Sequence, residues 1–206
     1  MPARDQTPSH SLAASLEPFL RLRKDDLTVG EMLGHIEGDD GPGPVLLVLT
    51  LPVLLPLPPG FSMVLALPLL LVAPQIVIGR RTVWLPGILS RRRVKREPLI
   101  KLVERVLPPL ERVETFVRPR LRFLTGRIGA AVVGIACTLI ALVLVLPIPF
   151  ANLVPALALG AFAIGLARRD GLFILAGYAL IAAAIGVVIL GVDGFTLGLG
   201  EVRRLV

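Results

Sequence analysis

Two long stretches of this 206-residue chain carry no charged side chain, and they constrain the fold more than any other feature. They cover residues 45–78 and 128–167, which contain no Asp, Glu, Lys or Arg. A hydrocarbon core about 30 Å thick is crossed by about 20 apolar residues of helix, and charge-free runs of this length are typical of membrane helices. A third apolar run, 172–192, has the length of one complete span. We therefore expect an all-α integral membrane protein and not a soluble enzyme.

Closely spaced prolines interrupt both charge-free stretches. The arm ahead of the first break, 45–55, would reach about 16 Å as a helix, roughly half of the hydrocarbon core. We therefore expect the first stretch to form a re-entrant hairpin that enters and leaves on the same side. The arms of the second stretch, 128–146 and 150–167, fit either two full spans or a deeper re-entrant hairpin. The residues that make the breaks are Pro56, Pro58, Pro59, Gly60, Pro147 and Pro149.

The two stretches also resemble each other. Leu55-Pro56-Leu57-Pro58 matches Leu146-Pro147-Ile148-Pro149 at an offset of 91 residues, and twin arginines close both second arms at an offset of 88. Paired, Pro-interrupted apolar segments are a sequence indication of a transporter-type site between two repeats. The alternative is that the Pro-x-Pro sequences make tight turns and serve folding only.

A helix that begins at such a break directs free backbone N–H groups and the positive end of its dipole towards the break, where an anion can bind. Ser62 and Asn152 lie in the first turns of the second arms, and we hypothesise that they line a pocket for a phosphate head group. Their alternative roles are a helix cap for Ser62 and a helix-end hydrogen bond for Asn152. The arginines that would gather phosphates at the cytoplasmic face are Arg80, Arg81, Arg168 and Arg169.

Charge is distributed unevenly between the polar segments. Residues 79–127 hold 14 Lys and Arg against four Glu, whereas residues 1–44 hold four basic and eight acidic residues. The positive-inside rule places 79–127 in the cytoplasm. Its apolar residues between 99 and 117 follow helical spacing, which predicts amphipathic interfacial helices cut into short pieces by Pro108-Pro109 and Pro119. We expect Arg91–Arg93 and Lys95-Arg96 to face anionic lipid rather than nucleic acid.

The N-terminal segment predicts two short surface helices, within 11–22 and within 28–36. Thr28 and Glu31 have the spacing of a capping box at the start of the second. The third apolar run carries Ala179, Ala183 and Gly186, which suggest a close-packed face. The tail 193–206 is expected on the periplasmic side.

Residue types needed for most enzyme chemistry are scarce. The chain has one cysteine, Cys137, which we expect to be plain packing, and two histidines, His10 and His35, both in the N-terminal segment. A disulfide cannot form within the chain, a His/Cys zinc site lacks ligands, and no Walker or dinucleotide glycine motif is present. We expect no catalytic residues, no metal and no cofactor. Proton-coupled antiport is disfavoured because no Asp, Glu, Lys, Arg or His lies within the apolar runs.

Several short motifs are distinctive in combination. They are Leu55-Pro56-Leu57-Pro58-Pro59-Gly60, Gly79-Arg80-Arg81, Trp84-Leu85-Pro86, Arg118-Pro119-Arg120-Leu121, Leu124-Thr125-Gly126-Arg127, Leu146-Pro147-Ile148-Pro149-Phe150-Ala151-Asn152-Leu153, Pro155 and Arg169-Asp170-Gly171. Together they resemble the exopolysaccharide synthesis ExoD family of bacterial membrane proteins. The resemblance covers about residues 28–192 and implies an inner-membrane protein needed for normal exopolysaccharide production, with no assigned catalytic residue. The paired hairpins also look like those of the DedA family, implicated in moving polyprenyl-phosphate carriers, although this chain lacks the membrane acids and arginines expected there.

The sequence thus predicts a multi-pass protein of the bacterial inner membrane, organised as segments 1–44, 45–78, 79–127, 128–167, 168–192 and 193–206. Our hypothesis is that it supports exopolysaccharide synthesis by binding or translocating an anionic, polyprenyl-phosphate type intermediate. The expected partners are anionic phospholipid, a lipid-linked saccharide carrier and a second copy in a homodimer. The alternative is a non-transporting scaffold or regulator that recruits synthesis or export components through 79–127.

Overall fold

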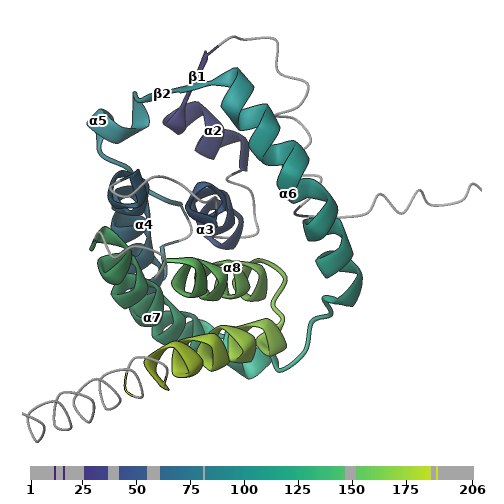
Figure 1. Ribbon diagram of the computed structural model, residues 1–206. Coiled ribbons are helices and arrows are strands. Elements are labelled where there is room, and N and C mark those ends of the chain that lie inside the picture. Colours follow the sequence, from purple (N-terminus) through teal and green to yellow (C-terminus); the bar gives the residue numbers. More distant parts are fainter. Residues whose placement is uncertain are drawn as a thin grey trace, which may run out of the picture.

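The computed structural model describes residues 12, 16, 26–36, 42–54, 61–80, 82–146, 152–186 and 189. The predicted proline breaks, Arg81 and the tail 193–206 lie outside these residues. The described part is almost entirely helical (Figure 1), as the sequence predicts. Its elements are β1 (Asp26–Thr28), α2 (Val29–Ile36), α3 (Gly43–Thr50), the 3-10 helix η1 (Leu51–Leu54), α4 (Phe61–Val77), α5 (Gly87–Ser90), β2 (Arg93–Lys95), α6 (Arg96–Phe116), the 3-10 helix η2 (Arg122–Thr125), α7 (Arg127–Val145), α8 (Leu153–Ala167) and the apolar helix Gly171–Gly186.

The core is built by packing the first charge-free stretch against the second. The most extensive helix contacts are those of α4 with α7 and of α3 with α8, while α3 with α4 and α7 with α8 share smaller contacts. Every residue of α3 is buried, and Figure 1 shows α3 surrounded by other helices. Each arm of one stretch therefore pairs mainly with an arm of the other.

Two glycines allow these helix pairs to approach closely. A Cβ on Gly43 would lie 2.5 Å from the backbone nitrogen of Ala167, and a Cβ on Gly134 would lie 2.8 Å from the backbone nitrogen of Val77. Gly134 follows Gly43 by 91 residues and Ala167 follows Val77 by 90. The same contact is thus made twice with the roles of the two stretches exchanged, as in an isologous contact between two copies.

Helix α6 corrects one prediction. It runs without interruption from Arg96 to Phe116, although Pro108 and Pro109 were expected to divide it. Each proline removes one bond to the carbonyl four residues earlier. Both prolines, Glu104 and Arg105 are exposed, so the two freed carbonyls lie on the side of the helix that solvent can reach.

The amphipathic character of α6 is as predicted. Leu99, Leu102, Val103 and Leu110 are buried, and Figure 1 shows α6 lying along the outside of α2, α3 and α8. On the exposed side, the Lys101 ammonium donates to the Glu97 carboxylate over 2.6 Å. This bond lowers the pKa of Glu97 and raises that of Lys101. Phe116 departs from the pattern, because 74% of its surface is exposed.

A short antiparallel ladder, not predicted from the sequence, ties the N-terminal segment to the basic layer. It pairs Thr28 with Arg93, Leu27 with Val94 and Asp26 with Lys95. Part of the run Arg91–Arg93 and Lys95-Arg96 is therefore strand. Three residues are too few for a period-2 pattern to indicate a strand.

The predicted capping box is confirmed. The Thr28 hydroxyl accepts from the Glu31 N–H at 3.2 Å, and the Glu31 carboxylate accepts from the Thr28 N–H at 2.9 Å. Residues of both predicted N-terminal helices contribute to the core, since Leu12, Leu16 and Met32 are buried. The Glu114 carboxylate of α6 accepts from the Leu12 N–H, which ties the start of the chain to α6.

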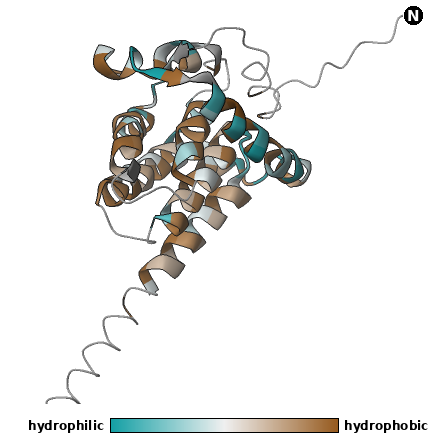
Figure 2. Cartoon of the chain, turned by 45° about the horizontal axis from the view of Figure 1, so that its top comes forward, coloured by the Kyte–Doolittle hydropathy of each residue, from teal (hydrophilic) through white to brown (hydrophobic). Residues whose placement is uncertain are grey.

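The bundle carries apolar side chains on its outside as well as in its core. Among the described residues, one helix is long and apolar enough to cross a membrane, α7, and only 33% of its most apolar window is buried. Its exposed stripe consists of Ile128, Val132, Ile135, Leu139 and Leu142. Figure 2 shows the bundle helices predominantly hydrophobic and the hydrophilic residues concentrated on one side.

The helix Gly171–Gly186 covers part of the predicted span 172–192. It packs through Ile174, which is buried, and through Tyr178, whose ring meets that of Phe162 edge-on with 4.9 Å between the ring centroids. Among the described residues, none covers the suggested close-packed face at Ala179 and Ala183, which are both exposed. Cys137 is buried in the core, as expected of plain packing.

Candidate functional site at the arginine-rich helix ends

Five helix ends gather at one end of the bundle. The start of α3 meets the end of α8 through Gly43 and Ala167, and the first half of α7 meets the end of α4 through Gly134 and Val77. The Gly171 N–H, at the start of the last apolar helix, donates to the Arg120 carbonyl ahead of α7 at 2.8 Å. We call this region the arginine end, because it carries Arg80, Arg118, Arg120, Arg122, Arg127, Arg168 and Arg169.

Helix α4 reaches the arginine end through a Schellman motif. Gly79 adopts a left-handed conformation with φ 74°. Its N–H donates to the Ile76 carbonyl at 3.0 Å, and the Arg80 N–H donates to the Gln75 carbonyl at 3.1 Å. These bonds satisfy carbonyls that the helix end leaves free, and they leave Arg80 exposed just beyond the helix.

Helix α8 ends with a related turn, but an arginine occupies the left-handed position. Arg169 has φ 52°, and the Asp170 N–H donates to the Gly165 carbonyl at 2.9 Å. A non-glycine residue there costs about 1–2 kcal/mol. Gly79 and Arg169 therefore occupy the equivalent left-handed positions after the two helices, 90 residues apart. The offset of 88 residues that matches the twin arginines in the sequence does not align these two helix ends.

Asp170 holds this end of the bundle together. Its carboxylate is completely buried. One oxygen accepts from the Arg118 N–H at 2.9 Å and the other from the Leu172 N–H at 3.0 Å. The second bond caps the last apolar helix, and the first fixes the segment that follows α6. A Cβ on Gly171 would lie 2.7 Å from Cβ of Leu121, so glycine is needed for this close approach.

The clamp brings together two separate sequence motifs, Arg118-Pro119-Arg120-Leu121 and Arg169-Asp170-Gly171. From the sequence alone, Asp170 is named only as part of the motif Arg169-Asp170-Gly171, with no role of its own. An aspartate immediately before a charge-free helix is nonetheless an N-cap signal, which could have identified one of its two bonds. The bond to Arg118, 52 residues away, has no local sequence signal.

A second clamp lies beside the end of α4. The Gln75 side chain donates to the Trp84 carbonyl and accepts from the Trp84 N–H, both at 2.7 Å. It also donates to the Leu71 carbonyl at 2.9 Å. The half-buried amide thereby ties the segment after Arg80 back to the helix, and the Trp84 ring remains 59% exposed.

The predicted site residues fall into two groups. Ser62 lies in the first turn of α4, and its side chain is outside the described residues. Asn152 directly precedes α8, is half-buried and makes no side-chain cap bond, while its carbonyl accepts from the Ala156 N–H at 3.0 Å. Both therefore lie a whole helix, about 25 Å, from the arginines that follow the same helices. The structure does not bring them to the arginine end.

The predicted arginines are distributed over the ends of two helices. Arg80 and Arg169 are exposed and Arg168 is half-buried. Guanidinium groups pair with phosphate through two parallel hydrogen bonds, which makes arginines at these helix ends chemically suited to phosphate. In the described part of the chain, no three His, Cys, Asp or Glu side chains gather as a metal site would require.

Comparison with known proteins supports the resemblance seen in the motifs. The family described as "Exopolysaccharide synthesis, ExoD" matches residues 12–190. The chain is 30% identical over 185 residues to "Protein ExoD" of Rhizobium meliloti, which covers 87% of this chain and 76% of that protein. It is 34% identical over 152 residues to an uncharacterized protein of Synechocystis sp., covering 73% and 71%. No solved structure matches. The chain belongs to the exopolysaccharide synthesis ExoD family.

Proposed function

We propose that this protein spans the bacterial inner membrane and supports exopolysaccharide synthesis by binding, and moving across the bilayer, an anionic lipid-linked intermediate of the polyprenyl-phosphate type. Family membership implies the role in exopolysaccharide synthesis. The observation that carries the rest is the gathering of seven arginines at the converging helix ends of an apolar bundle. The printed names of the relatives specify no ligand.

The outer surface of the bundle supports a membrane location. Helix α7 is apolar on its buried and its exposed faces, and α4 and the last apolar helix also expose large apolar side chains. A helix that is hydrophobic all round belongs in a core or in lipid. Because this outer stripe has no protein cover within the described chain, lipid is the medium that fits it.

The helix lengths support a hairpin that does not cross the bilayer. α3 and η1 together hold 12 residues, which reach about 20 Å, less than the hydrocarbon thickness of about 30 Å. The packing of α3 against α8 and α4 covers the short arm with protein, a condition for irregular backbone at membrane depth. In this proposal both hairpins begin and end at the cytoplasmic face, where the positive-inside rule puts their arginines.

The two groups of predicted residues then act at different depths. Arg80, Arg168 and Arg169 gather the phosphate at the cytoplasmic face, and Arg81 adds a further charge in the sequence. Ser62 and Asn152, at the starts of the second arms, offer a hydroxyl and an amide at the far end of the same helices. A phosphate head group would move from the arginines towards these helix starts, while its polyprenyl chain stays in lipid along the apolar outer face.

The direct test is transport of a fluorescent polyprenyl phosphate by purified protein in liposomes. Protein-loaded vesicles are expected to move the lipid between leaflets faster than empty vesicles, and an Arg80→Gln, Arg168→Gln, Arg169→Gln variant is expected to lose most of that rate. A matched variant replaces Arg91, Arg105 and Arg112, which lie on α6 or before it. Equal rates in empty and loaded vesicles at several pH values would refute transport.

A second experiment tests Ser62 and Asn152 in cells. Replacing both with Ala is expected to lower exopolysaccharide output at unchanged protein level. Unchanged output would assign the helix starts to folding only. If liposomes show no transport but charge reversal of Arg91–Arg93 removes co-purifying synthesis components, the scaffold alternative replaces our proposal.

A further inference from the structure

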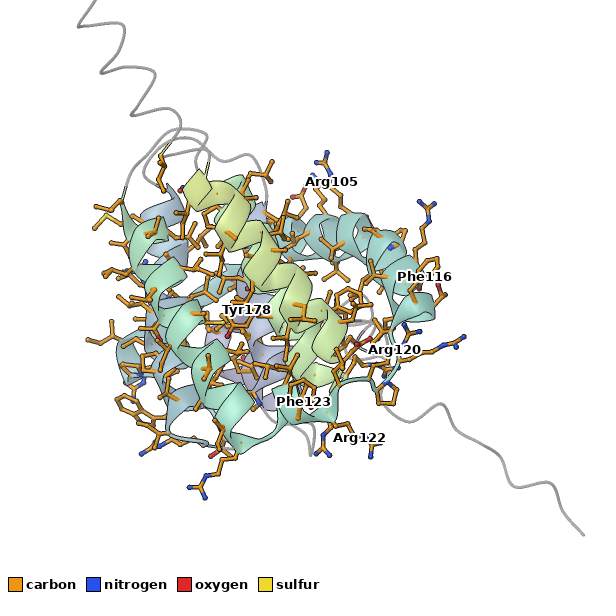
Figure 3. All side chains as sticks on the ribbon, turned by 90° about the horizontal axis from the view of Figure 1, so that it is seen from below. Arg105, Phe116, Arg120, Arg122, Phe123 and Tyr178 are labelled. Atoms are coloured by element: carbon orange, nitrogen blue, oxygen red, sulfur yellow. The ribbon has the colours of Figure 1, made fainter. Side chains whose placement is uncertain are left out.

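A segment in which two phenylalanines flank three arginines runs from the end of α6 towards the start of α7. Phe116 and Phe123 are 74% and 73% exposed. Between them, Arg118, Arg120 and Arg122 are all exposed. Figure 3 shows Phe116, Arg120, Arg122 and Phe123 along one edge of the molecule, with Arg105 at a distance on α6. We call residues 116–123 the rim.

The exposure of the rim is imposed by the fold. Asp170 accepts from the Arg118 N–H, and the Arg120 carbonyl accepts from the Gly171 N–H. Val117 is buried, which anchors the segment on its inner side. The Leu124 N–H donates to the Leu121 carbonyl at 2.9 Å and closes the turn into α7. With its backbone fixed at these points, the rim cannot turn its two phenylalanine rings into the core.

The position of the rim fits the head-group region of a bilayer. Phe123 lies four residues before Arg127, the first residue of the helix long enough to cross a membrane. Aromatic side chains are enriched at both ends of such spans, and arginines there reach lipid phosphates. Residues 116–123 contain three arginines and no acid. The nearby carboxylates of Glu114 and Asp170 are bonded to backbone N–H groups.

We propose that the rim docks on the anionic cytoplasmic leaflet, with Phe116 and Phe123 inserted at the boundary between head groups and acyl chains and Arg118, Arg120 and Arg122 paired with phospholipid phosphates. This inference does not depend on the lipid-linked intermediate. It assigns the rim to bulk anionic phospholipid, and it gives the Asp170 clamp the role of holding the rim at the membrane surface.

The test uses a tryptophan reporter in full-length protein reconstituted in liposomes. Trp84 is the only tryptophan of the chain, so Trp84→Phe with Phe123→Trp gives a single reporter in the rim. Quenching is measured with phosphatidylglycerol or phosphatidylcholine brominated at shallow or deep chain positions. The expected result is strongest quenching by shallow bromines, with a preference for the anionic lipid over the zwitterionic one.

Variants then assign the preference to the rim arginines. Each Arg→Gln change at 118, 120 or 122 is expected to lower the relative binding of anionic lipid about fivefold, the effect of removing one cation near an anionic surface. Single Gln changes at Lys101 and Arg105, two exposed residues of α6 outside the rim, serve as the matched controls and are expected to leave the preference measured by the rim reporter unchanged. A thermal unfolding midpoint equal to that of the parent confirms that the rim variants fold.

Two results would overturn the proposal. One is equal quenching by brominated phosphatidylglycerol and phosphatidylcholine. The other is a tryptophan reporter that neither brominated lipid quenches and that aqueous iodide does quench, which would place the rim in water or against a protein partner. Loss of polyprenyl-phosphate transport alone would refute the proposed function and leave the rim assignment standing.

Discussion

Replacing Asp170 with alanine is expected to destabilise the protein strongly, because the side chain is completely buried and makes two bonds at once. It accepts from the Arg118 N–H at 2.9 Å and from the Leu172 N–H at 3.0 Å. Loss of the bond to Leu172 removes the cap of the last apolar helix, which costs about 1 kcal/mol. Loss of the bond to Arg118 leaves an N–H without its carboxylate partner and costs about 1.5–3 kcal/mol.

The expected total for Asp170→Ala is about 3 kcal/mol of unfolding free energy. Asp170→Asn keeps one acceptor oxygen and nearly the same preference for the cap position, so it is expected to lose only the bond to Arg118. The loss for the asparagine variant should therefore be about 60–75% of the loss for the alanine variant. Glu111→Ala, an exposed acidic residue on α6, is the matched control and should change stability by less than about 0.5 kcal/mol.

The assay is equilibrium unfolding in mixed detergent micelles, combined with amide hydrogen exchange. In Asp170→Ala, hydrogen exchange is expected to become faster at the amides of Arg118 and Leu172. In Asp170→Asn, the Leu172 amide should keep its protection from exchange and the Arg118 amide should lose it. An alanine variant as stable as the parent, or unchanged protection of the Arg118 amide, would refute the clamp.

Two further predictions concern the helix contacts and the second clamp. Gly43→Ala and Gly134→Ala are each expected to lose about 1–3 kcal/mol in the same unfolding assay, since a Cβ would collide with backbone atoms of the partner helix. Gly160→Ala, which meets nothing within 4 Å, should be neutral or stabilising, and equal effects at all three positions would contradict the close approach. Gln75→Ala is expected to lower the unfolding free energy by at most about 1 kcal/mol per lost hydrogen bond. It is also expected to lower the fluorescence anisotropy of Trp84, and unchanged anisotropy would show that the Gln75 amide does not hold this segment.

Features with a local cause could be predicted from the sequence. The capping box of Thr28 and Glu31 depends on a spacing of three residues, and the buried face of α6 depends on helical periodicity. The continuity of α6 through Pro108 and Pro109 could not be predicted in this way. A proline breaks a helix where the freed carbonyl has no partner, and exposure of Glu104 and Arg105 is a property of the tertiary fold.

The candidate site was predicted in part. Charge counting indicated that arginines follow both second arms, and the structure places Arg80 and Arg169 just beyond the helix ends. The clamp of Asp170 on Arg118 was missed, because it joins residues 52 positions apart. Ser62 and Asn152 were predicted to line a head-group pocket at the helix starts, and the lengths of α4 and α8 set those starts about 25 Å from the arginines.

The proposed function depends most on one arrangement, in which the arginine-bearing helix ends share one face of the membrane. The direct measurement is labelling with a membrane-impermeant maleimide from either side of oriented vesicles, using single cysteines at Thr82, Arg122 and Arg169 in a Cys137→Ala background. Cys137 is the one cysteine in the sequence, so replacing it leaves only the introduced thiols. We expect all three positions to be labelled from the cytoplasmic side and none from the other. Labelling of any one of them from the opposite side would contradict the arrangement of the hairpins.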